Sequence, residues 1–274
     1  MASSNSINSS NEPSALAIRQ VTYDKIIIFG DSITELSNDI LSLSFALSPA
    51  LQHHYFRKLA IVTRGYGGYS SEHLQHVLVP TLRAETAAGE KVKLLVLEVG
   101  TNDASTNAMQ CVSTERFREN MKGMVEKAKE EGVERVIVIG PGPVDEGKLA
   151  SPIYNSTMRN RAYADTAKEV AEDCGVPFID LWHAFLEASG WKKGQPIFGQ
   201  GGSSKGDSLL GDLLTDGVHF SGDGYRIWYE ELLKTIQEKF PELMPENFPT
   251  VLPHIFDVDR TNLPATLWQK CQIK

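Results

Sequence analysis

The sequence is poor in cysteine and has no long apolar run. Among its 274 residues only Cys111, Cys174 and Cys271 are cysteines, and none stands in a Cys-x-x-Cys pair. Such wide spacing favours neither a disulfide framework nor a zinc site, and it fits a reducing compartment. No apolar stretch approaches the length of a membrane span. We therefore expect a protein without a membrane span and without bound metal.

The amino-terminal segment also lacks the features of a secretion signal. Residues 1–12 are rich in serine and asparagine and contain no apolar core of signal-peptide length. We expect a disordered tail over residues 1–20 and a cytoplasmic location.

Basic residues are not in excess. The chain carries 27 lysines and arginines against 35 aspartates and glutamates, for a formal net charge of −8. A nucleic-acid-binding surface requires clustered positive charge, so neither DNA nor RNA is an expected partner. A phosphate cradle is equally unsupported, because neither Gly-x-Gly-x-x-Gly after a strand nor a Walker-type lysine motif occurs.

What the chain does contain is an alternation of apolar runs and helical patterns, which is typical of a parallel, doubly wound sheet. The runs predict five strands, at residues 25–29, 60–63, 93–99, 135–139 and 177–180. The helical patterns lie at residues 40–53, 71–83, 114–130, 156–173 and 222–239. The sequence thus predicts an α/β fold, a three-layer α/β/α sandwich around a five-stranded, mainly parallel sheet.

The length is within the range of a single α/β domain. We expect this domain over residues 21–240. Residues 241–274 are rich in proline and aromatic side chains, which excludes a regular helix but leaves apolar anchors. We expect this extension to pack on the domain or to meet a second subunit in a homodimer. Residues 199–205 are rich in glycine and serine, which fits either a mobile flap or a solvated loop.

The first predicted strand breaks into Gly-Asp-Ser at residues 30–32. Open α/β folds bind ligands outside the carboxyl ends of their strands, so Ser32 is placed for chemistry. An Asp-Ser pair after a strand is also typical of a helix N-cap, and that alternative stays open on local evidence.

A base for Ser32 is available far downstream, where Asp216 and His219 lie three residues apart. A serine hydroxyl is a poor nucleophile until an imidazole takes its proton. His219 is the candidate base, and Asp216 is the candidate carboxylate that orients its ring. Gly217 makes the required turn easy. A capped turn without catalytic meaning is the alternative interpretation.

Two glycine-containing segments follow the next predicted strands. Residues 64–71 include a glycine-rich run whose backbone N–H groups are free for close approach, and residues 100–103 include the side-chain amide of Asn102. Acyl transfer requires donors aimed at the oxygen that becomes negative in the tetrahedral intermediate. Simple turns are the alternative for each segment taken singly.

These segments together carry a resemblance. Four blocks resemble, in matching order, those of the SGNH (GDSL) hydrolase superfamily: Gly30-Asp31-Ser32, Gly68, Gly100-Thr101-Asn102-Asp103 and Asp216-Gly217-Val218-His219. Three further segments resemble its isoamyl acetate-hydrolysing esterase branch: residues 64–69, 140–146 and 252–259. The resemblance covers residues 24–260.

The resemblance implies an SGNH/flavodoxin-like fold and a division of roles. Ser32 would be the nucleophile, His219 the base and Asp216 its orienter. The N–H groups of Ser32 and Gly68 and the amide of Asn102 would form the oxyanion hole. The implied reaction is a two-step acyl transfer that needs no metal and no cofactor.

Three functions from different classes are compatible with these residues. The leading hypothesis is a serine esterase that hydrolyses small, short-chain acyl esters. An acyltransferase or cyclase would use the same acyl-serine but pass the acyl group to an acceptor other than water. A non-catalytic α/β ligand-binding module is the third.

Overall fold

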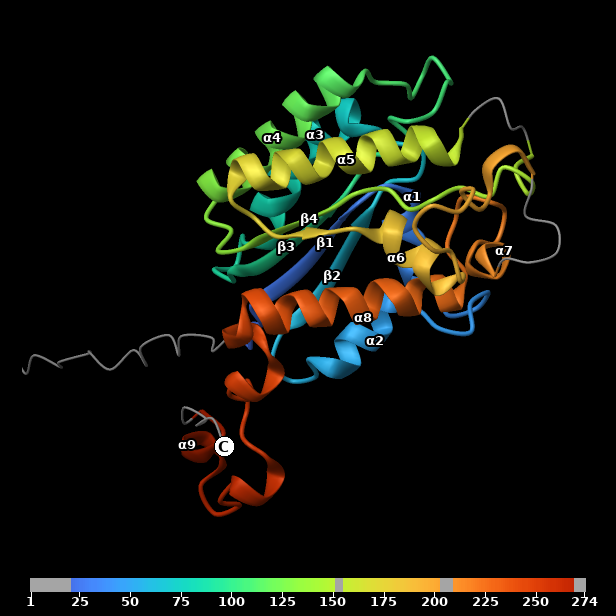
Figure 1. The fold of residues 1–274 in the computed structure, drawn as a ribbon. Coiled ribbons are helices and arrows are strands. Elements are labelled where there is room, and N and C mark those ends of the chain that lie inside the picture. Colours follow the sequence, from blue (N-terminus) through green and yellow to red (C-terminus); the bar gives the residue numbers. More distant parts are fainter. Residues whose placement is uncertain (1–20, 151–154, 203–208, 269–274) are drawn as a thin grey trace, which may run out of the picture.

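The protein is built around a five-stranded sheet. The computed structural model describes residues 21–150, 155–202 and 209–268. The strands are β1 (Lys25–Gly30), β2 (Ala60–Gly65), β3 (Val92–Glu98), β4 (Val136–Ile139) and β5 (Phe178–Ile179). They lie in the order β2-β1-β3-β4-β5, and each neighbouring pair is parallel (Figure 1). The predicted parallel α/β sheet is confirmed. The tail predicted at residues 1–20 lies outside the described residues, as do residues 203–205 of the glycine-rich loop.

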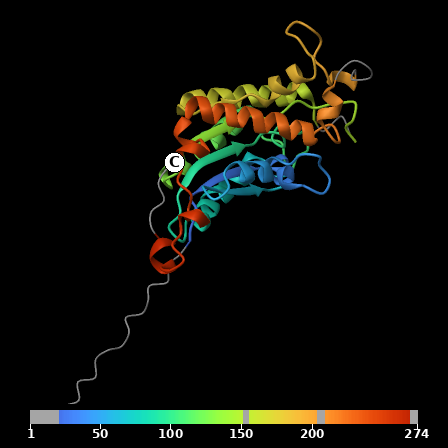
Figure 2. The same cartoon turned by 90° about the horizontal axis from the view of Figure 1, so that it is seen from below.

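Helices cover both faces of the sheet (Figures 1 and 2). One face carries α3 (Ser71–Glu85), α4 (Thr114–Glu130) and α5 (Thr157–Cys174). The other carries α2 (Leu47–His54), α6 (Leu181–Ala188) and α8 (Gly222–Lys239). The inner strand β1 contributes to the cores on both faces, because Ile27 and Phe29 join one apolar cluster while Ile26 and Ile28 join the other. A strand buried on both faces reads as a continuous apolar run, which is why the sequence predicted it.

One predicted helix starts at the wrong residue. The sequence pattern predicted a helix over residues 40–53, but α2 begins at Leu47. The Asp39 carboxylate accepts hydrogen bonds from the N–H groups of Leu41 and Ser42, both at 3.0 Å, and so holds a turn there. Pro49 then falls in the first helical turn, where its missing N–H costs nothing.

Another helix was not predicted at all. Residues 181–185 were interpreted from the sequence as an apolar packing segment, but they belong to α6 (Leu181–Ala188). Its N-cap is Asp180, whose carboxylate accepts from the His183 N–H at 3.0 Å. The strand predicted at residues 177–180 is correspondingly shorter and ends at Ile179. The cap residue was therefore counted as part of the strand.

The strand order places a switch point between β1 and β3. From β1 the chain moves outward to β2, and it then returns to the other side of β1 as β3. In doubly wound sheets ligands bind in the crevice outside the carboxyl ends of the strands at such a point. Ser32 follows β1 and Asn102 follows β3, so both predicted site residues lie at this crevice.

The segment after α8 forms short turns instead of a regular helix, as predicted. It contains three 3₁₀ turns and the one-turn helix α9 (Leu263–Thr266). Leu243 is buried in the apolar cluster beneath α8. Farther along, α9 lies away from the layered body in both views (Figures 1 and 2). Contact with a second subunit stays a prediction.

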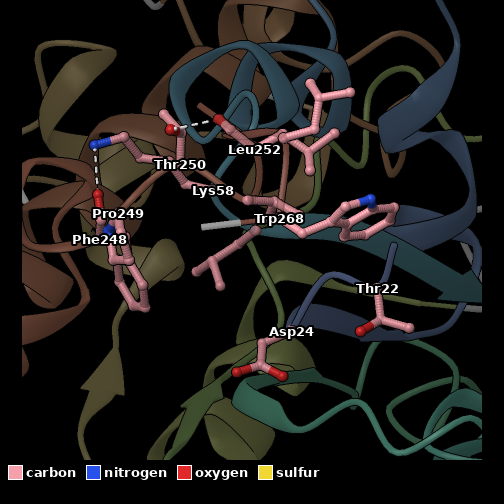
Figure 3. Close-up of a pocket in the computed structure, with 11 residues that line it drawn as sticks. Thr22, Asp24, Lys58, Phe248, Pro249, Thr250, Leu252 and Trp268 are labelled. Carbon is pink, nitrogen blue, oxygen red and sulfur yellow. Dashed lines mark hydrogen bonds between the residues drawn. The ribbon is translucent and has the colours of Figure 1, made fainter. Parts of the chain in front are cut away.

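Cationic side chains before β2 bind this carboxyl-terminal segment. The Arg57 guanidinium donates to the carbonyls of Leu252 at 2.7 Å and Pro253 at 2.8 Å. The Lys58 ammonium donates to the Phe248 carbonyl at 2.9 Å (Figure 3). A cavity of about 460 Å³ lies between the segment and Thr22 and Asp24, which precede β1. This cavity is thus at the opposite end of β1 from Ser32.

Within the described residues, no helix combines the length and the apolar character needed to cross a membrane.

Candidate active site

Ser32 is the first residue of α1 (Ser32–Glu35), directly after the end of β1. The N-cap is Asp31, whose carboxylate accepts from the Ile33 N–H at 2.9 Å. Gly30 allows this tight junction, because a Cβ there would lie 2.2 Å from the Glu98 carbonyl oxygen on β3. The N–H groups of a helix's first turn have no intrahelical acceptor, so the Ser32 N–H is available to a ligand. Asp31 can therefore cap α1 while Ser32, the next residue, faces the candidate site.

Ser32, His219 and Asp216 form one hydrogen-bonded chain. Nδ1 of His219 lies 2.7 Å from Oδ2 of Asp216, and Nε2 lies 2.9 Å from Oγ of Ser32. A carboxylate can only accept, so the proton of the neutral ring belongs on Nδ1. Nε2 is then the acceptor for the Ser32 hydroxyl. The arrangement is that of a nucleophile, a base and a group that fixes the tautomer of the base.

The turn that carries Asp216 and His219 is held from both sides. Its ends are joined by an antiparallel bridge between Leu214 and Phe220. Gly217 has φ +96°, and a Cβ there would lie 2.6 Å from the Asp145 carbonyl oxygen. Only glycine fits this position without strain. The sequence stretch therefore specifies the turn that aims the imidazole at Ser32.

The Asp216 carboxylate is kept ionised by its own turn. Burial acts to raise its pKa, but hydrogen bonds from the His219 backbone and ring and from the Val218 N–H outweigh burial and lower the pKa below its ordinary value. The two backbone bonds measure 2.9 Å from His219 and 3.0 Å from Val218. An ionised Asp216 can stabilise an imidazolium on His219.

The predicted glycine-rich loop runs beside Ser32. A Cβ on Gly67 would lie 3.9 Å from Ser32 Cβ, and the Gly67 N–H donates to the Glu35 carboxylate at 2.6 Å. Gly68 has φ +79° and is exposed. Among the described residues no acceptor is bound by the Gly68 N–H, so this donor is available at the edge of the site.

Asn102 approaches from the end of β3. Its Nδ2 donates to the Tyr69 carbonyl at 3.0 Å and, over a longer 3.3 Å, to the Asp31 carboxyl. Its Oδ1 accepts from Nε2 of Gln110 at 3.0 Å. The structure thus brings Asn102 to the loop that contains Gly68, as the sequence predicted.

Buried carboxyl groups of Asp31, Glu98 and Asp103 underlie the site. Sequence reasoning considered Asp31 only as part of a helix N-cap and gave Glu98 no role. Burial raises the pKa of Asp31 to about 7 and that of Asp103 to about 6. For Glu98, burial and then the neighbouring Asp31 raise the pKa well above its ordinary value. The Thr34 hydroxyl donates to Glu98 at 3.1 Å. Burial and the neighbouring Asp31 therefore both favour the protonated form of Glu98.

The cavity at these residues has a volume of about 320 Å³. Its lining includes Ser32, Asn102, His219 and Gln110, with Leu149 and Val218 among its apolar walls. Within the described residues, no cluster of three or more His, Cys, Asp and Glu side chains could hold a metal ion. The groups present can activate a hydroxyl and bind a developing oxyanion.

A second Asp-x-x-His pair lies beyond β5. Nδ1 of His183 is 2.8 Å from Oδ2 of Asp180. The ring borders a separate cavity of about 720 Å³ that Arg161 and Trp191 also line. Among the described residues no hydroxyl or thiol hydrogen-bonds Nε2 of His183. This pair therefore lacks a nucleophile.

Sequence comparisons agree with the geometry. The model of the GDSL-like lipase/acylhydrolase family matches residues 28–227. The isoamyl acetate-hydrolyzing esterase of Saccharomyces cerevisiae is 32% identical over 251 residues, which cover 86% of this chain and 95% of the relative. A human protein named isoamyl acetate-hydrolyzing esterase 1 homolog is 26% identical and covers 86% of this chain and 88% of its own.

Solved structures share the architecture. The lipase/acylhydrolase of Enterococcus faecalis superposes with a TM-score of 0.55 at 27% identity, covering 79% of this chain and 96% of that one. An acetylxylan esterase of Geobacillus stearothermophilus gives a TM-score of 0.58 at 20% identity, covering 78% and 94%. The second likeness shows the fold alone.

Proposed function

The chain belongs to the GDSL-like lipase/acylhydrolase family and is a carboxylic ester hydrolase, and we propose that it cleaves small, acetyl-type esters through an acyl-serine on Ser32. The observation that carries this proposal is the 2.9 Å contact between Ser32 Oγ and His219 Nε2, with Asp216 behind the ring. The catalytic roles of all three residues are part of the proposal.

In the first step Ser32 Oγ attacks the ester carbonyl carbon, and its proton passes to Nε2 of His219. The carbonyl oxygen becomes an oxyanion in the tetrahedral intermediate. Its donors are the N–H groups of Ser32 and Gly68 and the side-chain amide of Asn102. Such preorganised donors act on the charge that develops in the transition state. When the intermediate collapses, Nε2–H protonates the departing alcohol oxygen, leaving an acyl ester on Ser32.

In the second step a water molecule repeats the sequence. It gives a proton to Nε2 of His219 and attacks the acyl carbonyl carbon. Collapse of this intermediate breaks the bond to Ser32 Oγ, which recovers the proton from Nε2. The products are a free carboxylic acid and the original enzyme.

The cavity and the named relatives both favour a small substrate. A volume of about 320 Å³ suits a ligand at the small end of the usual range of enzyme pockets. The yeast relative is named for the hydrolysis of isoamyl acetate, an ester of a two-carbon acid. We propose the same substrate class here, with residues 21–240 forming the hydrolase domain.

The test compares wild type with Ser32→Ala on acetate esters of graded alcohol length. We expect hydrolysis by wild type, none by Ser32→Ala, and attachment of a serine-reactive phosphonate to Ser32 alone, detected by mass spectrometry of peptides. The exposed Ser42→Ala is the matched control and should keep wild-type activity. Turnover by Ser32→Ala at the wild-type rate would mean a different nucleophile.

The same assay separates hydrolysis from acyl transfer. Added alcohols compete with water for the acyl-serine, and the ratio of free acid to exchanged ester reports the preferred acceptor. We expect mainly free acid. Mainly exchanged ester at low alcohol concentration would favour the acyltransferase alternative.

A further inference from the structure

The Gln110 side chain connects two of the three proposed oxyanion donors. Its Nε2 donates to the Gly68 carbonyl at 3.1 Å and to Oδ1 of Asn102 at 3.0 Å. Gln110 also lines the cavity that contains Ser32. A single amide nitrogen thus uses both of its hydrogens on the elements that face the substrate carbonyl.

These contacts determine which way the Asn102 amide points. The Gly68 carbonyl can only accept, so the Gln110 atom that faces it must be the nitrogen. The Asn102 atom that faces this nitrogen must then be the oxygen. The Asn102 nitrogen is consequently turned to the opposite side, where it donates to the Tyr69 carbonyl. Its longer bond to Asp31, at 3.3 Å, is the one that an oxyanion can replace most easily.

The same nitrogen restrains the glycine of the loop. Gly68 is exposed, has φ +79° and has no side chain to hold it. On the preceding side the loop is held by the bond from the Gly67 N–H to Glu35. On the following side its carbonyl is held by Gln110. Without Gln110 the peptide group that follows Gly68 keeps only the bond from the Tyr69 N–H to the Tyr66 carbonyl, at 3.1 Å. The carbonyl end is then unrestrained, which costs preorganisation of the donor.

Gln110 itself is held in place by the loop that carries it. Its N–H donates to the Asn107 carbonyl at 2.9 Å, and the adjacent Cys111 N–H donates to the same carbonyl at 2.8 Å. The Val112 N–H then returns to the Asp103 carbonyl at 3.2 Å. The loop after β3 therefore carries Asn102 on one side and its positioning partner on the other.

We infer that Gln110 is a positioning residue, which sets the orientation of the Asn102 amide and the Gly68 peptide for oxyanion binding. This inference rests on the proposed function, because it requires the hydrolysis at Ser32. Gln110 itself does not touch the oxyanion. Its effect falls on the transition state, in which charge develops, more than on the bound ester.

The experiment uses two substitutions in the full chain. Gln110→Met keeps the length of the side chain and removes both donated bonds. Gln110→Glu keeps the shape but places a carboxylate against two acceptor oxygens, which favours rotation of the Asn102 amide. We expect kcat to fall about ten- to a hundred-fold with KM changed less than threefold, below the loss caused by deleting a direct donor. Gln110→Glu should be the slower of the two.

Gln52 supplies a matched control. Its amide also bridges two backbone groups, donating to the Leu59 carbonyl at 3.2 Å and accepting from the Ile61 N–H at 2.9 Å. Gln52 lies on α2, however, and its partners lie around the start of β2. Gln52→Met should leave kcat within twofold of wild type. The midpoint of thermal unfolding, measured for every variant, separates lost folding from lost positioning.

A double-mutant cycle identifies the route by which Gln110 acts. In an Asn102→Ala background, Gln110→Met should lower kcat only a few-fold, because one of its two targets is already gone. An undiminished loss in that background would overturn the inference. So would wild-type kcat for folded Gln110→Met and Gln110→Glu when Ser32→Ala is inactive, and that result would leave the proposed function standing. Activity in Ser32→Ala would instead remove the proposed function itself.

Discussion

Two Asp-x-x-His turns in this molecule are built alike, one at the centre of the sheet edge and one beyond its outermost strand. In both, the aspartate accepts from the backbone N–H and from Nδ1 of the histidine three residues later. The distances are 2.9 and 2.7 Å for the Asp216–His219 pair and 3.0 and 2.8 Å for the Asp180–His183 pair. The internal geometry of the turn therefore does not distinguish them.

The two pairs differ in what lies next to Nε2 of the histidine. Nε2 of His219 meets the Ser32 hydroxyl, whereas Nε2 of His183 meets no hydroxyl or thiol among the described residues. The outer pair caps a helix, since Asp180 is the N-cap of α6. The Asp-x-x-His motif is thus a local turn that forms in different parts of the fold. It provides a candidate catalytic pair only where the fold places a nucleophile beside the second ring nitrogen.

The largest expected effect tests this contrast directly. His219→Ala should lower kcat by about six orders of magnitude, because Ser32 loses its proposed base. His183→Ala should leave kcat within twofold of wild type. Steady-state kinetics on a short acetate ester, with unfolding midpoints for both variants, provide the measurement. Equal losses from the two substitutions would mean that the distinction drawn here is wrong.

The next effect concerns the proposed oxyanion donors, which lie near the Asp216–His219 pair and not near the Asp180–His183 pair. Asn102→Ala should lower kcat about a hundred- to a thousand-fold, the usual cost of one oxyanion donor. The reason is that the side-chain amide is proposed to bind the charge developed by attack of Ser32. The check is the kcat of the variant alongside its KM, which should change little. An unchanged kcat would exclude Asn102 from the site.

A third difference between the two regions is the ionisation of the buried carboxyl groups of Asp31 and Glu98, which lie beneath the Ser32 site. Burial raises the pKa of Asp31 from its ordinary 3.8 to about 7, so the folded state binds more protons than the unfolded state between these values. By linkage, this group lowers the free energy of unfolding as pH rises from 3.8 to about 7. Glu98 adds to the same fall, because its pKa is also raised in the folded state. Glu98→Gln, which cannot ionise, should remove this contribution and flatten the fall. Chemical denaturation from pH 4 to pH 8 measures it.

A variant that changes no ionisable group supplies the control for this pH experiment. Gln52→Met should show the same pH slope as wild type, because the glutamine side chain does not titrate. If Glu98→Gln instead lost stability at pH 8 and not at pH 5, the side chain would have to be ionised in the folded protein. That result would contradict a protonated Glu98.

The smallest effect belongs to the outer pair as a cap. Asp180→Ala should lower the free energy of unfolding by about 1 kcal/mol, the usual cost of removing an N-cap side chain. Its kcat should match wild type. Thermal or urea unfolding gives the first quantity and an ester assay the second. A kcat reduced with no change in stability would point to a role for the Asp180–His183 pair in the reaction.

The strands and long helices could be predicted because their signals are local. The predicted helices at residues 222–239 and 114–130 coincide with α8 and α4. The N-cap of α4 is Ser113, whose side chain accepts from the Arg116 N–H. The start of α2 was missed because the Asp39 turn competes with the helix. Pro49 was a usable signal, since a helix begun at residue 40 would have placed this proline in its interior.

The site was predictable to the extent that it resembles known blocks. Ser32 and His219 are 187 positions apart, so no periodicity could have joined them, but the motifs did. Glu98 carried a signal that was not used, as a charged residue inside an apolar strand run. Gln110 carried none. Its role arises from the course of a loop that returns to Gly68, and pattern alone does not specify such a path.

The carboxyl-terminal segment held by Arg57 and Lys58 lies near the start of β1, and Ser32, the proposed nucleophile, follows the end of β1. A bead, an electrode or a fused reporter joined beyond that segment would therefore be anchored on the far side from the substrate entrance. Immobilisation through that end should leave the cavity at Ser32 accessible to solvent and substrate.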